Sequence, residues 1–192
     1  MITTKQHILQ ESQELLMKEF QHDYTIDSLS KDLKRSKRTI YRFFESKYEL
    51  IREVLVIHKS ELVVSFEKIS KEEDLGIEKL IRYIYLINDT LREIRLSRWY
   101  QHAKQYPDIQ EEYFSIRFEI IEEYLKSGLN PYSKALSSYG KSSDEITNFI
   151  VNSLENYYFH TESQILQQSI KTGYVDDLIF LLYGSLISVS HD

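Results

Sequence analysis

The stretch KRSKRTIYRFFESKYEL, which runs from Lys34 to Leu50, decides the fold of this chain. It holds six Lys or Arg residues and only two Glu residues, although the whole chain has a formal net charge of -6. Ser36 can cap a short helix in which Ile40 and Phe44, four residues apart, share one face. The cations and Tyr41 then point largely outward. The stretch therefore predicts a short helix that presents polar and cationic groups and buries only a narrow apolar edge.

Two further helices are predicted before this stretch. Thr3 with Gln6 fits a capping box, which opens a first helix that ends near His22. The second helix is about two turns long and covers residues 25–33. Its apolar residues fall on one stripe: Ile26, Leu29 and Leu33. Three short helices with a tight break between the second and third are the plan of a helix-turn-helix, whose last helix enters the major groove of DNA.

Helices are also predicted for the rest of the chain, because apolar residues recur at spacings of three and four. Ser46 with Glu49 forms a second capping box and opens a long helix that runs to about Ser70. Its expected inner face is Leu50, Ile51, Val54, Leu55, His58 and Leu62. Later helices are predicted at about 77–91, 93–105, 109–127, 143–171 and 174–189, with breaks at Gly76, over residues 128–131, at Gly140 and at Gly173. The fold class is all-α with about nine helices: a helix-turn-helix domain over 1–46 and a helical C-terminal domain over 47–192.

The charge is distributed unevenly along the chain. Residues 1–59 hold eleven Lys or Arg against nine Asp or Glu, net +2, and residues 60–192 hold thirteen against twenty-one, net -8. Residues 31–47 alone have seven positive and two negative side chains, net +5. Clustered cations attract the DNA backbone without regard to sequence. The alternative, which the residues leave open, is a solvated helical face of no special function.

Composition excludes several other classes of protein. The chain has no Cys, so neither a disulfide nor a thiolate metal site is expected. Its start lacks the pattern of a signal peptide, and its apolar runs are too short for a membrane span, so we expect a cytoplasmic protein. The glycines and six histidines are scattered, and the acidic pairs are adjacent and hence splayed around a helix. We therefore expect no enzyme, no catalytic residue, no metal and no cofactor.

The residues Thr25-Ile26-Asp27-Ser28-Leu29 and the stretch from Ser36 to Leu50 resemble, in order and spacing, the N-terminal domain of TetR-family regulators. The likeness covers roughly residues 5–57. It implies a transcriptional regulator, most often a repressor, that binds a pseudo-palindromic DNA operator as a homodimer and is released by a small-molecule effector. A co-regulator that acts through a protein partner, with little operator binding of its own, is the alternative.

The resemblance also implies which residues meet DNA. Thr25, Tyr41 and Lys47 would contact phosphates, and the start of the third helix would line the groove. With Arg35 of the turn, the predicted set is Thr25, Arg35, Ser36, Lys37, Arg38, Thr39, Tyr41, Arg42 and Lys47. In the turn the family usually has a glycine followed by a small apolar residue, but this chain has Lys34 and Arg35. A positive φ at Lys34 would cost roughly 1 kcal/mol.

The C-terminal part predicts a dimer interface. The segment after Gly173 is apolar on almost every side, and a helix of this kind must be covered all round. Burial within a monomer is one way to cover it, and a four-helix interface between two subunits is the expected way. The predicted interface residues are Ile146, Ile150, Leu154, Leu178, Leu182, Ser185, Leu186 and Val189.

Aromatic residues crowd the same part of the chain, which holds twelve of the fifteen tyrosines beyond residue 60. In the family that the N-terminus resembles, the helices here surround a cavity for the effector. The candidate ligand-binding residues are Trp99, Tyr100, Phe114, Phe118 and Tyr157. An ordinary aromatic core is the alternative.

Overall fold

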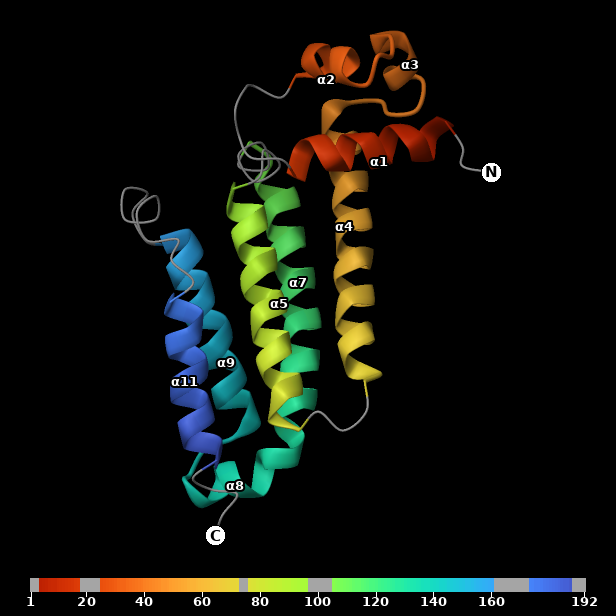
Figure 1. Cartoon of the computed structure of the whole chain (residues 1–192). Helices are drawn as coiled ribbons and strands as arrows, with labels where there is room; N and C mark the ends of the chain where they lie inside the picture. Colours follow the sequence, from red (N-terminus) through yellow and green to blue (C-terminus); the bar gives the residue numbers. More distant parts are fainter. Residues whose placement is uncertain (1–3, 18–24, 73–75, 97–104, 161–172, 188–192) are drawn as a thin grey trace. The chain divides into compact units, whose positions relative to one another are not determined.

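The computed structural model describes residues 4–17, 25–72, 76–96, 105–160 and 173–187, and all regular structure in these ranges is helical. The all-α prediction is confirmed (Figure 1). The elements are α1 (Thr4–Met17), α2 (Ile26–Asp32), α3 (Lys37–Tyr41), α4 (Lys47–Ser70), α5 (Ile77–Leu96), α7 (Pro107–Leu129), the 3₁₀ turn η1 (Asn130–Tyr132), α8 (Ser133–Ser138), α9 (Ser143–Glu155), the π-helical turn η2 (Asn156–His160) and α11 (Gly173–Ile187).

The chain divides into two compact units. The first unit comprises residues 1–63 and 93–117, and the second comprises residues 64–92 and 118–192. The boundary that the sequence predicts at residue 46 separates the helix-turn-helix domain from the C-terminal domain. This boundary stays a prediction.

In the first unit, α1 lies across the first turns of α4 (Figure 1). Two polar contacts connect the helices: Lys5 Nζ is 2.6 Å from Glu53 Oε1, and Gln13 donates to Glu61. The apolar side of α4 is buried as expected, at Leu50, Ile51, Val54, Leu55, His58 and Leu62. Ile8 and Leu16 of α1 are buried as well. These side chains form the core of the first unit, against which the short helices α2 and α3 pack.

In the second unit, α9 and α11 run side by side in opposite directions (Figure 1). The rings of Tyr157 and Tyr174 stack with their centroids 4.4 Å apart, and the Tyr174 hydroxyl donates to the Ser153 carbonyl. Both helices are also joined to α5. The Tyr158 hydroxyl donates to Asn88 Oδ1 at 2.6 Å, and the Tyr85 hydroxyl donates to Asp176 Oδ1 at 2.6 Å.

Two predicted helix boundaries differ from the structure, and one predicted break is present. The break expected near residue 92 does not occur, since α5 continues unbroken to Leu96. The break predicted over residues 128–131 is present, since α7 ends at Leu129 and a 3₁₀ turn follows. Gly128 lies in the last turn of α7, where a Cβ would stand 3.3 Å from the Tyr83 ring, so this glycine permits close packing. The helix predicted over 143–171 changes to π geometry after Glu155, and its later part lies outside the described residues.

Within the ranges that the structure describes, none of the helices combines the length and apolar character needed to cross a bilayer.

Candidate nucleic-acid interface

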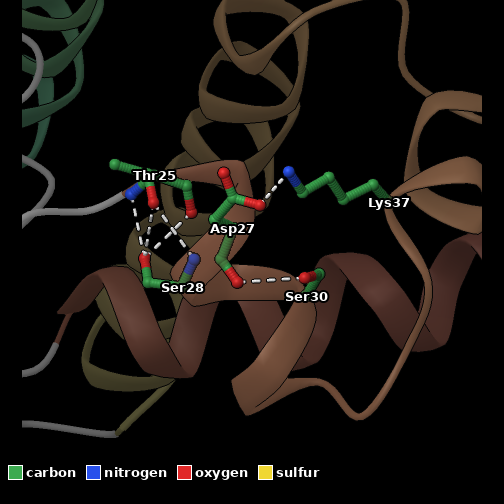
Figure 2. A network of polar contacts seen from close by, with 5 residues as sticks. All are labelled: Thr25, Asp27, Ser28, Ser30 and Lys37. Carbon is green, nitrogen blue, oxygen red and sulfur yellow. Dashed lines mark hydrogen bonds and ion pairs between the residues drawn. The ribbon is translucent and has the colours of Figure 1, made fainter.

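The helix-turn-helix begins at a capping box on α2. Thr25 Oγ1 accepts from the Ser28 N–H at 3.0 Å, and Ser28 Oγ accepts from the Thr25 N–H at 2.9 Å (Figure 2). These two bonds satisfy donors that a helix start leaves without intrahelical partners. The first turn of α2 is therefore fixed by short-range contacts, although α2 has only seven residues.

The turn between α2 and α3 closes as a Schellman motif. The Arg35 N–H donates to the Ser30 carbonyl at 2.9 Å, and the Lys34 N–H donates to the Lys31 carbonyl at 3.1 Å. Lys34 has a φ of 50°, in the left-handed region where glycine is usual. The turn therefore keeps the left-handed geometry at Lys34 although the residue is not a glycine. Because Arg35 is exposed, no apolar side chain closes the motif at that position.

The third helix, α3, is capped and anchored by very few residues. Ser36 Oγ accepts from the Thr39 N–H at 3.1 Å, as the sequence predicted for its cap. Ile40 and Phe44, the two residues predicted to share a face, are fully buried. They pack into the core of the first unit, which also contains the buried side chains of Leu29 and Leu33 on the α2 side. This arrangement leaves the rest of α3 to face solvent.

The outward side of α3 carries most of the predicted DNA-binding residues. Lys37, Arg38 and Arg42 are exposed, and Tyr41 is 50% exposed. The Arg42 guanidinium lies 4.7 Å from the ring centroid of Phe43, which restricts its position by a cation–π contact. Thr39 is half-buried, and its hydroxyl is 2.8 Å from Ser36 Oγ. Of the remaining predicted residues, Thr25 and Arg35 are exposed, and Lys47 is half-buried at the start of α4.

Sequence reasoning missed one residue of this surface. Asp27, in the first turn of α2, forms an ion pair with Lys37, the first residue of α3 (Figure 2). The two residues are ten apart in the sequence and meet only because the turn brings α2 and α3 together. No local pattern identifies such a pair.

A second missed cluster connects the start of α4 to the start of α7. The Tyr48 hydroxyl donates to Asp108 Oδ2 at 2.5 Å, and Arg52 Nη2 is 3.1 Å from Glu112 Oε2. The Tyr48 hydrogen bond lowers the pKa of the Asp108 carboxyl, and the same bond raises the pKa of the Tyr48 phenol. Tyr48 is the next residue after the predicted phosphate contact Lys47, and Arg52 lies further along the same end of α4. This cluster therefore fixes the end of α4 that borders the candidate interface.

Four of the eight predicted dimer residues are already covered within one chain. Ile150, Leu154, Leu178 and Leu182 are buried, and Ile146 is half-buried. Ser185 and Leu186 fall within α11, and Val189 lies outside the described residues. The apolar side chains that α9 and α11 expose are different ones: Phe149 at 52%, Phe180 at 77%, Leu181 and Tyr183.

The predicted ligand-binding residues are described only in part. Trp99 and Tyr100 lie outside the described residues, and Phe114 and Phe118 are half-buried on α7. Tyr157 is half-buried and packs against Tyr174 and Tyr158, neither of which is among the predicted ligand-binding residues. Their role in ligand binding stays a prediction.

Comparison with known proteins places the fold. No family profile and no curated protein matches the chain. Among solved structures, it resembles a protein from Mesorhizobium loti MAFF303099 that is assigned to the TetR family of transcriptional regulators. That likeness has a TM-score of 0.60 and 14% sequence identity, over 96% of this chain and 94% of the other. It also resembles GusR from Salmonella enterica, with a TM-score of 0.58 and 16% identity, over 95% of each chain. The chain therefore has the fold of TetR-family regulators.

Proposed function

We propose that this chain is a cytoplasmic, sequence-specific DNA-binding transcriptional regulator. The observation that carries the proposal is α3: a capped helix at the end of a closed helix-turn-helix turn, with Lys37, Arg38, Tyr41 and Arg42 directed outward. The fold shared with a TetR-family structure supports the same reading.

In this proposal the exposed residues divide into two groups. Thr25, Tyr41 and Lys47 bind phosphates, which sets the register of the protein on the duplex. Lys37, Arg38 and Arg42 face the major groove, where an Arg or Lys side chain recognises the O6 and N7 acceptors of guanine. Arg38 is the best candidate for direct base recognition, because its side chain is exposed and has the planar fork that matches guanine.

We further propose that the regulator is a homodimer that binds a pseudo-palindromic operator. The support is the exposed apolar surface of α9 and α11, formed by Phe149, Phe180, Leu181 and Tyr183. The buried residues of the predicted set, such as Leu154 and Leu178, would then hold the two helices together beneath the interface. Two-fold symmetry would place the two copies of α3 about 34–36 Å apart, or a multiple of that distance.

Repression with release by a small-molecule effector completes the proposal. Its support is the regulator fold together with the aromatic side chains of the helical body, among them Tyr157.

Fluorescence anisotropy with the DNA upstream of the protein's own gene tests the proposal. The titration includes an excess of unrelated duplex, and it compares the natural protein with Arg38→Ala and with a control, Lys68→Ala, on the distant part of α4. We expect saturable binding that resists the competitor, that Arg38→Ala weakens by roughly 10-fold or more, and that Lys68→Ala preserves. Binding that is weak and indifferent to sequence would instead favour the co-regulator with a protein partner.

A further inference from the structure

The ion pair between Asp27 and Lys37 places a carboxylate on the surface that we assign to DNA (Figure 2). Both side chains remain more than half exposed, at 61% for Asp27 and 54% for Lys37. An acidic group beside a phosphate backbone weakens DNA binding. The position of the Asp27 carboxylate between Thr25 and α3 therefore calls for an explanation. The inference that follows rests on the proposed DNA-binding function.

Asp27 is held in place on both sides by α2. Its backbone carbonyl accepts a hydrogen bond from Ser30 Oγ at 2.9 Å, and the capping box of Thr25 and Ser28 fixes the same turn (Figure 2). The carboxylate also lies in the first turn of α2, where the positive end of the helix dipole favours an anion. The backbone of Asp27 is therefore fixed, and its short side chain has few conformations from which to meet the longer side chain of Lys37.

Lys37 is the flexible side chain of the pair. It opens α3, where an ammonium group is disfavoured by the helix dipole, and its four-carbon stem has several rotatable bonds. Its ammonium group has three donors, so one can serve Asp27 while the others serve an acceptor in the groove. When the Asp27–Lys37 ion pair persists in the complex with DNA, it neutralises most of the charge of Lys37. The ammonium group can still donate its remaining hydrogen bonds to acceptors in the groove.

We propose that Asp27 is a positioning residue that makes Lys37 a reader of base edges instead of a general phosphate contact. Binding to unrelated DNA depends on the number of cations that neutralise phosphates, and the pair lowers that number by one. Binding to the operator depends on hydrogen bonds of fixed direction, and the pair supplies one from an ordered side chain. Asp27 therefore increases the ratio of specific to non-specific affinity.

The test uses four variants: Asp27→Asn, Lys37→Gln, the double variant, and Asp32→Asn as a control that removes the same charge from the exposed end of α2. Each is titrated by anisotropy against two duplexes over a series of salt concentrations. One duplex is selected by the natural protein from a random-sequence library, and the other has an unrelated sequence. Urea denaturation of each variant shows whether the fold is kept.

Asp27→Asn is expected to bind the unrelated duplex about threefold to fivefold more tightly, in keeping with the small energy of an exposed ion pair. The slope of log affinity against log salt should steepen by about 0.9 for that duplex, which is the signature of one additional phosphate contact. Affinity for the selected duplex should change less than about twofold, so the specificity ratio falls. In the Lys37→Gln background, Asp27→Asn should change neither quantity.

Three results overturn the inference in distinguishable ways. If Asp27→Asn does not differ from Asp32→Asn in slope and ratio, the pair is only a structural contact and the DNA-binding function stands. An effect that persists in the Lys37→Gln background shows that Asp27 acts on DNA directly and not through Lys37. A natural protein that binds neither duplex contradicts the proposed function itself, and the inference fails with it.

Discussion

At the scale of single residues, capping contacts fix the starts of the short helices, and the turn between α2 and α3 brings more distant side chains together. The caps at Ser36 and Ser142 were predictable, because a capping side chain and its N–H partner lie within three residues. The pair of Asp27 with Lys37 was not predictable, since it exists only after the turn has closed. The predicted box of Ser46 with Glu49 is half formed: Ser46 Oγ accepts from the Glu49 N–H at 3.1 Å, but the Glu49 carboxylate accepts from the Glu45 N–H instead of the Ser46 N–H.

Lys34 stores backbone strain at the turn, and Lys34→Gly should relieve it. The left-handed conformation costs an ordinary residue about 1–2 kcal/mol, and glycine loses about 0.5–1 kcal/mol of this gain through the entropy of its unfolded chain. We expect Lys34→Gly to raise the free energy of unfolding by roughly 0.5–1 kcal/mol in urea denaturation. Lys34→Ala retains the strain and should show no such gain; an equal gain in both variants would assign the effect to the lost charge.

Tyr158 should make the protein sensitive to high pH. Burial raises the pKa of its phenol from 10.0 to about 12, and the hydroxyl donates to Asn88. The native state therefore favours the protonated phenol, so this stabilisation is complete below pH 10 and is lost as the pH rises toward 12. In urea denaturation at several pH values, Tyr158→Phe should lose less stability than the natural protein between pH 9 and 11. Parallel pH profiles for the two proteins would contradict this assignment.

At the scale of elements, predictability followed helix length and the strength of the apolar pattern. The long helix α4 was predicted from its capping residues to Ser70, and all six residues of its predicted inner face are buried. Phe66 and Ile69, further along the same helix, are buried as well and were not predicted. The six-residue helix α8 was missed, because a segment so short and rich in serine shows no apolar period. The packing role of Gly128 was missed, since only the neighbouring Tyr83 ring explains why a small residue is needed there.

The capping box of α9 offers a prediction at this scale. Ser142 Oγ accepts from the Glu145 N–H at 3.1 Å, and Glu145 Oε2 accepts from the Ser142 N–H at 2.8 Å. Ser142→Ala removes the first bond and should lower the free energy of unfolding by about 1 kcal/mol. The adjacent Ser143→Ala, inside the first turn, is the control and should be close to neutral. Equal losses in both variants would show that the cap carries no particular stability.

At the scale of the whole molecule, the sequence indicated that α9 and α11 need a partner subunit. It did not indicate which of their side chains are buried within the chain and which are exposed. An apolar pattern does not distinguish the side of a helix that packs in its own chain from the side that packs on another. Ile150 and Leu178 are buried in the chain itself, and Phe149 and Phe180 are exposed. The dimer remains a proposal, and these exposed residues now define it.

Phe180→Glu should dissociate the proposed dimer, because it places a charge in an apolar interface. Sedimentation velocity should show a monomer for this variant and a dimer for the natural protein. Affinity for a two-half-site duplex should fall by about 100-fold, since the second half-site is no longer bound by a linked subunit. Tyr139→Glu, which changes another exposed aromatic residue at the end of α8, should remain dimeric. A natural protein that is monomeric at all concentrations would contradict the dimer.

In the proposed complex, α3 occupies the major groove and recognises bases there. Dimethyl sulfate footprinting tests it directly, because the reagent methylates guanine N7 in that groove. On a duplex selected by the natural protein, the account predicts two protected groups of guanines related by two-fold symmetry, with centres about 10 base pairs apart or a multiple of that spacing. Arg38→Ala should restore methylation at one position in each group while flanking guanines stay protected. Guanines that remain fully reactive in a saturated complex would contradict the placement of α3 in the major groove.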